Sequence, residues 1–262
     1  MIPKQIHYIW FGGNELPDDA LQCMESWQKY CPEYEVIRWD ESNFDVSINR
    51  YVEEAYESKK WAFVSDYVRL WALVNYGGIY MDTDVELTAP IDQFLTHRAF
   101  SGFESNKSIP TGIMGCEKDF PLFQALLDDY STRSFIQDDG SFDLTTNVIA
   151  ITEACLSRGL VLNNEYQEID GLALYPSDWF CPKSHETGAV NITSNTRAIH
   201  HFSGSWLDPV ERQLVDRKLE ILARHPNMPH LFVGAYVRIM HGFSTGDFAP
   251  FMNMFRMFLR GR

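Results

Sequence analysis

The sequence predicts an α/β fold: a Rossmann-like nucleotide-binding sheet flanked by helices, followed by a helical C-terminal appendage. Three observations predict it. Strand-like and helix-like segments alternate at the start of the chain, as a nucleotide-binding α/β half requires. Residues 61–88 read as a helix, a Gly-Gly break, a short apolar run and two aspartates. The final segment carries only helical patterns. For a chain of 262 residues we therefore expect a main domain over residues 1–209 and an appendage over residues 210–262.

The first 60 residues predict two strands and two helices. Residues 6–11 (IHYIWF) and 34–39 (YEVIRW) are rich in aromatic and branched side chains, which strands prefer. Residues 16–30 place apolar side chains on one helical face, with a proline near the start. Residues 51–60 form a polar helix that we expect on the outside of the fold.

Residues 61–76 predict a helix with two distinct faces. Its apolar residues recur at steps of three and four, which places one stripe against the core: Phe63, Tyr67, Leu70, Trp71 and Val74. A polar arc of roughly 100° lies beside that stripe. It carries a small residue, a hydroxyl, an acid and a base: Ala62, Ser65, Asp66 and Arg69. Gly77 and Gly78 end the helix, as glycine does past a helix C-terminus.

Two aspartates follow the short apolar strand of residues 79–81. Asp82 and Asp84 are two positions apart, so on a strand they point to the same side and repel each other unless a cation lies between them. Oxygen ligands of this kind suit Mg²⁺ or Mn²⁺. Taken alone, an Asp-X-Asp is more often a solvated turn. Its place directly after a buried strand favours a ligand site, because open α/β sheets bind ligands there.

The composition narrows the class of protein. The net charge is −14 with a pI near 4.9, which disfavours a general nucleic-acid role because phosphate backbones require basic patches. The five cysteines are scattered and odd in number, so we expect reduced thiols in a cytoplasm. The first residues lead directly into a strand rather than a secretory signal. No apolar run approaches the roughly 20 residues of a spanning helix.

The middle of the chain predicts further strands and helices in a mixed pattern. Short strand-like elements are expected at residues 99–103, 109–115, 159–161 and 172–175. Helices are expected at residues 122–130 and 144–158. Residues 135–142 form an acidic, loop-like stretch that we expect to help bind an acceptor molecule.

The stretch around the aspartates resembles a known family. Ser65-Asp66-x-x-Arg69, followed by Gly77-Gly78-Ile79-Tyr80-Met81-Asp82-Thr83-Asp84-Val85, is similar to the glycosyltransferases with a DXD sugar-binding region. That family includes bacterial capsular-polysaccharide transferases and the yeast α-1,6-mannosyltransferase that initiates outer chains. The glucosylating domain of the large clostridial toxins is similar. The resemblance implies a GT-A fold, a nucleotide-sugar donor, a divalent metal (Mn²⁺ or Mg²⁺) and retention of anomeric configuration.

The resemblance also implies roles for individual residues. It gives a catalytic set of Asp66, Arg69, Asp82 and Asp84. It gives a donor-binding set of Trp10, Ser65, Asp66, Arg69, Tyr80, Asp82, Asn147, Ser205 and Trp206. Asp66 would bind sugar hydroxyls, and Trp10 would stack on uracil. The alternatives are structural: a strand tryptophan is usually core, an i,i+3 acid–base pair is a helix salt bridge, and Asn147 at a helix start is often a cap.

A second stretch, residues 198–206 (AIHHFSGSW), resembles the segment that supplies the last metal ligand in this fold. The matching ligand lies five residues before a tryptophan, which is His201, while Trp206 would meet the donor diphosphate and Ser205 would add a donor to it. His200 would then be structural, because adjacent strand residues face opposite ways. The alternative is a surface histidine pair and a core tryptophan.

The tail after Pro226 differs from the rest of this acidic chain. It is rich in Met and Phe, and its charged residues are Asp247 and four arginines: Arg238, Arg256, Arg260 and Arg262. A basic, apolar end favours an interfacial membrane helix, which would suit a lipid-linked acceptor. A helical pair packed on the main domain or on a second subunit is the alternative, and the sequence slightly favours it.

The resemblance, taken with these patterns, implies a metal-dependent, retaining glycosyltransferase that would move a hexose from a UDP-sugar to a surface polysaccharide or its lipid-linked precursor. GDP replaces UDP in the mannosyltransferase branch. We expect a cytoplasmic protein, with peripheral contact to the inner face of the membrane if the tail is interfacial. A haloacid-dehalogenase-type phosphatase would also use Asp82 and Asp84, but it wants Thr or Val where this chain has Glu86. A catalytically silent sugar-binding module is the third possibility.

Overall fold

The fold was analysed in a computed structural model, which describes residues 1–109, 112–205 and 207–260. The chain forms two compact units, each described by itself below. The sheet unit comprises residues 1–182 and 191–201, and the helical unit comprises residues 183–190 and 202–262.

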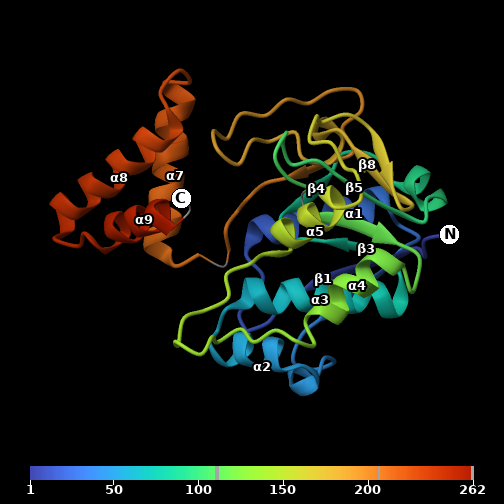
Figure 1. The fold of residues 1–262 in the computed structure, drawn as a ribbon. Helices are drawn as coiled ribbons and strands as arrows, with labels where there is room; N and C mark the ends of the chain where they lie inside the picture. Colours follow the sequence, from blue (N-terminus) through green and yellow to red (C-terminus); the bar gives the residue numbers. More distant parts are fainter. Residues whose placement is uncertain (110–111, 206, 261–262) are drawn as a thin grey trace. The chain divides into compact units, whose positions relative to one another are not determined.

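A mixed seven-stranded sheet organises the sheet unit (Figure 1). Its strands run in the order β2-β1-β3-β6-β5-β8-β7. The pairs β1–β2, β1–β3 and β5–β8 are parallel and the others antiparallel. The strands are β1 (Gln5–Ile9), β2 (Glu35–Trp39), β3 (Gly78–Met81), β5 (Ala99–Gly102), β6 (Ile113–Cys116), β7 (Gln167–Ile169) and β8 (Leu172–Tyr175). A second sheet holds β4 (Val85–Leu87) and β9 (Ala198–His200).

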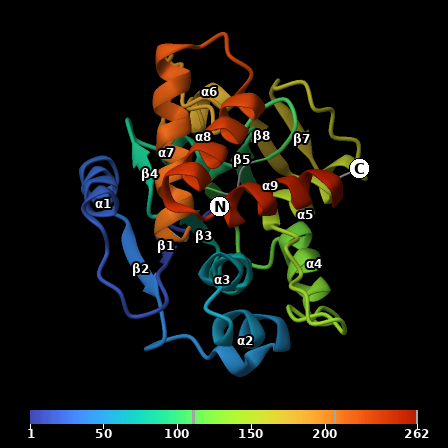
Figure 2. The ribbon, with the colours of Figure 1, turned by 90° about the vertical axis from the view of Figure 1, so that its left-hand side faces the viewer.

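Helices flank this sheet and continue after it, which confirms the predicted α/β class with a helical C-terminal segment. The sheet unit contains α1 (Asp18–Tyr30), α2 (Arg50–Glu57), α3 (Trp61–Tyr76), α4 (Pro121–Asp129), α5 (Asn147–Leu156), α6 (Ser177–Phe180) and the 3-10 turns η1 (Val46–Ile48) and η2 (Asp92–Thr96). The helical unit contains α7 (Pro209–Arg224), α8 (His230–Thr245) and α9 (Ala249–Arg260), labelled in Figure 2. None of the described helices combines the length and apolarity needed to cross a membrane.

The sheet has a hydrophobic core on each face. Helices α2, α3 and α4 lie together below β1 and β3 in Figure 1 and contribute to one core, while α1 and η2 contribute to the other. Because successive strand residues point to opposite faces, Ile79 and Met81 enter the second core and Tyr80 points toward the α3 side. This alternation decides which β3 side chain meets the polar arc of α3.

The connection from α3 to β3 depends on two glycines. Gly77 and Gly78 have φ angles of 71° and 93°, in the region that L side chains rarely adopt. A Cβ on Gly77 would lie 2.8 Å from the Lys118 nitrogen, and one on Gly78 would lie 2.9 Å from the Gln5 oxygen. The predicted end of the helix is therefore confirmed, and the tight turn places the aspartates after β3 close to α3.

The structure corrects two details of the predicted elements. Residues 159–161 do not form a strand, because the Leu160 N–H donates to the Cys155 carbonyl and closes the end of α5. The strand lies at Gln167–Ile169 instead. The helix predicted over residues 144–158 is shorter and begins at Asn147. Strand β4, directly after the aspartates, was not predicted.

Candidate active site

The two aspartates lie in the turn between β3 and β4. The Asp82 N–H donates to the Gly112 carbonyl at 2.8 Å, and the Val85 N–H donates back to the Asp82 carbonyl at 3.0 Å. These bonds fix the backbone of the turn, so both carboxylates are held half-buried. The aspartates therefore lie in an ordered turn at the end of a buried strand, rather than on the strand itself as the sequence analysis assumed.

Strand pairing brings a histidine to the aspartates. Val85 on β4 is paired with His200 on the antiparallel strand β9. The His200 Nε2 atom lies 3.3 Å from Asp84 Oδ1 and 3.8 Å from Asp82 Oδ2. One ligand atom from each of the three residues lies within 4.8 Å of the others. We call Asp82, Asp84 and His200 the acidic–histidine cluster.

The predicted third ligand, His201, lies elsewhere. Its Nε2 atom is 2.9 Å from Glu86 Oε2, and its backbone N–H donates to the Asp84 carbonyl at 3.0 Å. Because successive residues on β9 face opposite sides, only one of the two histidines can face the aspartates. The structure places His200 there, in the position that the sequence analysis assigned to His201.

The donor set of the cluster fits a divalent cation. Two carboxylates and one imidazole are ligands that Mn²⁺ accepts readily, while Mg²⁺ prefers oxygen throughout. Burial lowers the pKa of His200, but the Asp84 carboxylate, the Cys181 side chain and the Asp82 carboxylate together outweigh burial, and the pKa stands well above its ordinary value. The protonated imidazole thus supplies positive charge between the carboxylates, which is the charge that a bound cation would provide.

Arg69 links the polar arc of α3 to this cluster. Its Nη2 atom lies 3.4 Å from Asp66 Oδ1 and 3.4 Å from Asp82 Oδ1. The guanidinium lies over the Tyr80 ring, 4.5 Å from its centroid, and the Tyr80 hydroxyl donates to Asp82. Burial raises the pKa of Tyr80 well above its ordinary value, so the phenol stays a hydrogen-bond donor. The structure therefore brings together Asp66, Arg69, Tyr80 and Asp82, as predicted for one site.

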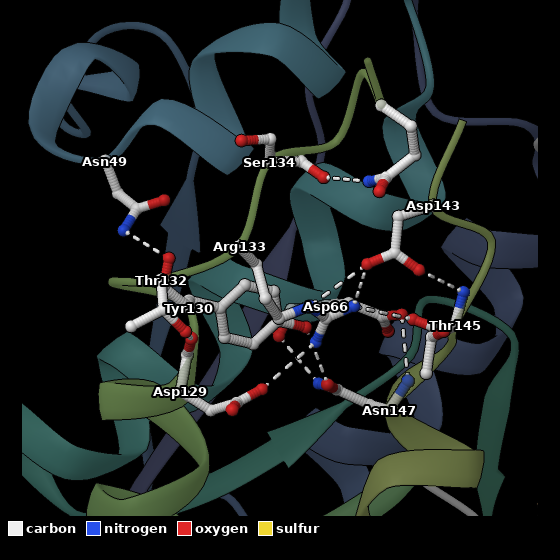
Figure 3. A network of polar contacts seen from close by, with 11 residues as sticks. Asn49, Asp66, Asp129, Tyr130, Thr132, Arg133, Ser134, Asp143, Thr145 and Asn147 are labelled. Atoms are coloured by element: carbon white, nitrogen blue, oxygen red, sulfur yellow. Dashed lines mark hydrogen bonds and ion pairs between the residues drawn. The ribbon is translucent and has the colours of Figure 1, made fainter. Parts of the chain in front are cut away.

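Asp66 is buried and anchored to α5 (Figure 3). Its Oδ2 atom accepts the backbone N–H of Asn147 at 3.0 Å, and its carbonyl accepts the Asn147 side-chain amide at 2.6 Å. Burial raises the pKa of Asp66 to about 6, although Arg69 opposes this shift. The carboxylate is ionised at neutral pH and changes charge within the physiological range.

Asn147 is fully engaged with the protein. Besides its two bonds to Asp66, its amide oxygen accepts the Tyr130 hydroxyl at 2.9 Å. Asn147 thus lies beside the candidate site, but it faces Asp66 rather than open space. Its direct contact with a sugar stays a prediction. Tyr130 carried no sequence signal for the site, because its contact with Asn147 depends on how the loop between α4 and α5 folds back.

The other predicted donor-binding residues are placed as follows. Trp10 follows β1, at the same edge of the sheet as the aspartates, and its indole N–H donates to the Asn14 carbonyl at 2.7 Å. The ring is half-buried against the second core. The Ser65 hydroxyl lies 3.4 Å from the Tyr80 hydroxyl. Ser205 belongs to the helical unit, and Trp206 lies outside the described residues, so their roles stay predictions.

A family model matches the part of the chain that builds this site. Residues 17–101 match the model described as a glycosyltransferase sugar-binding region containing a DXD motif. The matched region includes α3, β3 and both aspartates. It lends no support to the phosphatase alternative.

Curated relatives match at moderate identity. Inositol phosphoceramide mannosyltransferase 3 of Schizosaccharomyces pombe is 31% identical over 129 residues, 46% of this chain and 35% of the relative. Subversion of eukaryotic traffic protein A of Legionella pneumophila is 27% identical over 186 residues, 58% of this chain and 28% of the relative. The chain thus spans about a third of the length of these two relatives. An uncharacterized glycosyltransferase of Acanthamoeba polyphaga mimivirus is 25% identical over 201 residues, 70% of this chain and 77% of the relative.

Solved structures of glycosyltransferases also show partial likeness. The PaToxG glycosyltransferase is 19% identical with a TM-score of 0.41, covering 48% of this chain and 58% of its own. The galactosyltransferase LgtC is 12% identical with a TM-score of 0.41, covering 88% of this chain and 99% of its own.

Proposed function

We propose that the protein is a metal-dependent glycosyltransferase of the GT-A fold, because residues 17–101 match the model of the glycosyltransferase sugar-binding region that contains a DXD motif. The observation that carries the proposal is the acidic–histidine cluster, whose three ligand atoms lie within 4.8 Å of one another beside the Asp66–Arg69 pair. The donor is a nucleotide-sugar, with UDP-hexose as the expected class, and the anomeric configuration is retained.

The reaction breaks the bond between the anomeric carbon and the diphosphate oxygen and forms a bond to an acceptor hydroxyl oxygen. The nucleoside diphosphate leaves with the bonding electrons, and the proton of the acceptor hydroxyl passes to the departing diphosphate oxygen. Asp82, Asp84 and His200 would hold Mn²⁺ or Mg²⁺, which would supply positive charge for the diphosphate. The other proposed roles belong to charged side chains of the protein, which are already held close to the atoms that gain charge as the bond breaks.

Asp66 and Arg69 act on the sugar side of that bond. The ionised Asp66 carboxylate accepts hydrogen bonds from sugar hydroxyls. Arg69 forms an ion pair with both that carboxylate and Asp82, since its Nη2 atom is 3.4 Å from an oxygen of each. Trp10 stacks on the nucleotide base in this proposal, with its indole already oriented by the Asn14 carbonyl. Ser65 and Tyr80 line the donor site, and Ser205 and Trp206 contact the diphosphate.

Calorimetric titration of a nucleotide-sugar panel with and without Mn²⁺ tests the proposal. We expect metal-dependent binding of one UDP-sugar, followed by its turnover when acceptor saccharides are added. Asp84→Asn should abolish the metal dependence. Glu86→Gln is the matched control, because Glu86 lies on the same strand pair but contacts His201 instead of the cluster. Binding of GDP-sugars alone would move the protein to the mannosyltransferase-like branch. Metal-independent binding without turnover would identify a silent sugar-binding module.

The proposed acceptor is a saccharide or a lipid-linked saccharide presented at the inner face of the cell membrane to a cytoplasmic enzyme. The apolar face of α8 supports peripheral contact there, because four exposed side chains fall on one helical arc: Phe232, Tyr236, Met240 and Phe243. In vesicle sedimentation, the wild-type protein should bind anionic vesicles, and Phe232→Ser with Phe243→Ser should release it. Equal sedimentation of both proteins, or dimerisation without vesicle binding, would favour packing on protein.

A further inference from the structure

A single guanidinium closes the base of the loop between α4 and α5. The Arg133 Nη2 atom donates to Asp143 Oδ2 at 2.7 Å, and its Nε atom donates to the same oxygen at 3.1 Å. Nη2 also donates to the Thr145 carbonyl at 3.3 Å. Figure 3 shows Arg133 between the outgoing and the returning segment of this loop. The Arg133 side chain therefore ties the two ends of the loop together, in addition to the backbone hydrogen bonds within the loop.

Two tyrosine rings form the seat of this guanidinium. The Arg133 guanidinium carbon lies 4.5 Å from the Tyr130 ring centroid and 4.8 Å from that of Tyr51. The rings themselves meet edge to face, with centroids 4.8 Å apart, and both are almost fully buried. The Arg133 side chain is itself only 15% exposed, so its cation–π and ionic contacts are poorly screened by water.

We call Arg133 with its partners Asp143, Tyr51 and Tyr130 the clasp. Two chains of hydrogen bonds connect the clasp to Asp66. On one route, Asp143 Oδ1 accepts the Thr145 N–H at 3.0 Å, which fixes the backbone two residues before Asn147. On the other, the Tyr130 hydroxyl donates to the Asn147 amide oxygen at 2.9 Å. Both routes end on the residue whose backbone N–H donates to Asp66. A single clasp thus controls the position of the Asp66 hydrogen-bond partner.

We propose that Arg133, acting through Asp143, Tyr130 and Asn147, is a positioning residue that holds the Asp66 carboxylate in its working orientation. The inference rests on the proposed function only where it assigns Asp66 to the sugar. Breaking the clasp frees the start of α5, withdraws the Asn147 N–H and removes a cation that faces Asp66. The other charged groups facing Asp66 are Arg69 and Asp82, and both remain in place.

The test compares Arg133→Gln, Asp143→Asn, the double variant and Arg133→Lys. Carboxyl ¹³C NMR follows the titration of Asp66, and amide hydrogen exchange follows Asn147. We expect a higher pKa for Asp66 in Arg133→Gln, which loses a cation that faces Asp66, and roughly tenfold faster exchange at Asn147 in both single variants. The double variant should be no worse than either, and Arg133→Lys should recover part of the effect. With a nucleotide-sugar donor, kcat/KM should fall by about tenfold to a hundredfold.

Arg98→Gln is the matched control, since it breaks a 2.7 Å ion pair with Glu117 that has no contact with Asp66 or Asn147. The proposal is overturned if folded Arg133→Gln keeps the wild-type Asn147 exchange rate and Asp66 titration. If Arg133→Gln does not fold, Asp143→Asn decides, because an amide oxygen still accepts the Thr145 N–H. Shifted NMR and exchange readouts in a protein that transfers no sugar would uphold the positioning role and refute the proposed function.

Discussion

His200 and Asp84 face each other across two antiparallel strands, with Nε2 3.3 Å from Oδ1. The contact is set by the register that pairs Val85 with His200. A shift of one residue would exchange His200 for His201, because neighbouring residues on a strand face opposite sides. The composition of the candidate metal site therefore depends on strand register, and each side chain near it can be tested separately.

Replacing the two histidines one at a time distinguishes them. His200→Ala should weaken Mn²⁺ binding by at least about tenfold, because the cluster loses one of its three ligand atoms. His201→Ala should leave the metal titration unchanged, since the His201 imidazole contacts Glu86 and is not one of the three ligand residues of the cluster. Calorimetric or electron-paramagnetic titration of Mn²⁺ measures both. The reverse result would restore His201 as the ligand.

Gly112 allows the His200 ring to approach the aspartates. A Cβ at this position would lie 2.8 Å from His200 Nδ1 and 3.1 Å from the next ring atoms. Gly112→Ala should therefore displace the imidazole and reduce Mn²⁺ affinity about tenfold to a hundredfold without removing any ligand. Gly234→Ala, where nothing lies closer than 3.9 Å, is the control. Unchanged affinity in Gly112→Ala would mean that the His200 ring is not needed for binding.

The raised pKa of Asp66 predicts two pH effects. Its carboxyl must be ionised to accept sugar hydroxyls, so donor kcat/KM should rise with pH through about 6. In the metal-free protein, the folded pKa exceeds the ordinary value of 3.8, so ionisation opposes folding. The cost is absent below pH 3.8 and fully present above pH 6, where it reaches about 3 kcal/mol.

Urea unfolding checks the stability effect. Asp66→Asn should gain more stability relative to wild type at pH 7.5 than at pH 4.5, because the asparagine cannot ionise. A gain that is equal at both pH values would show that Asp66 has an ordinary pKa in the fold.

Arg69 should be important for stability as well as for the site. Arg69→Met leaves Asp66 and Asp82 near each other without their shared cation, so we expect a loss of about 3–5 kcal/mol in unfolding free energy. Arg38→Met breaks a more exposed ion pair with Asp40 and should cost about 1 kcal/mol or less. Denaturant unfolding at pH 7.5 compares the two. Equal losses would mean that burial of Arg69 adds nothing to its ion pairs.

Local patterns explain what the sequence could predict about the site. Ser65, Asp66 and Arg69 share a helical arc, and Tyr80 and Asp82 follow within a few residues through the Gly77–Gly78 turn, so their proximity needs no long-range information. The choice between His200 and His201 requires the register of β9 against β4, and no local pattern encodes it.

The contact between Asp66 and Asn147 is likewise not encoded by any local sequence pattern. Asn147 was expected near the site because of the family resemblance. That it binds Asp66, and that Tyr130 and Arg133 support it, follows from the folded loop rather than from spacing. Residues 159–161 have a strand-like composition, yet the N–H of Leu160 closes a helix end. Composition alone does not decide which backbone group a residue will bond to.

The pairing of β4 with β9 also has a consequence for the order of folding. Strands β1 and β3 and helix α3 come from the first third of the chain, whereas the partner of Val85 is synthesised only when His200 emerges. Closing so long a loop is slow and follows local structure. A growing chain therefore presents two neighbouring carboxylates long before their histidine arrives, and the cluster becomes complete only when the sheet unit is nearly finished.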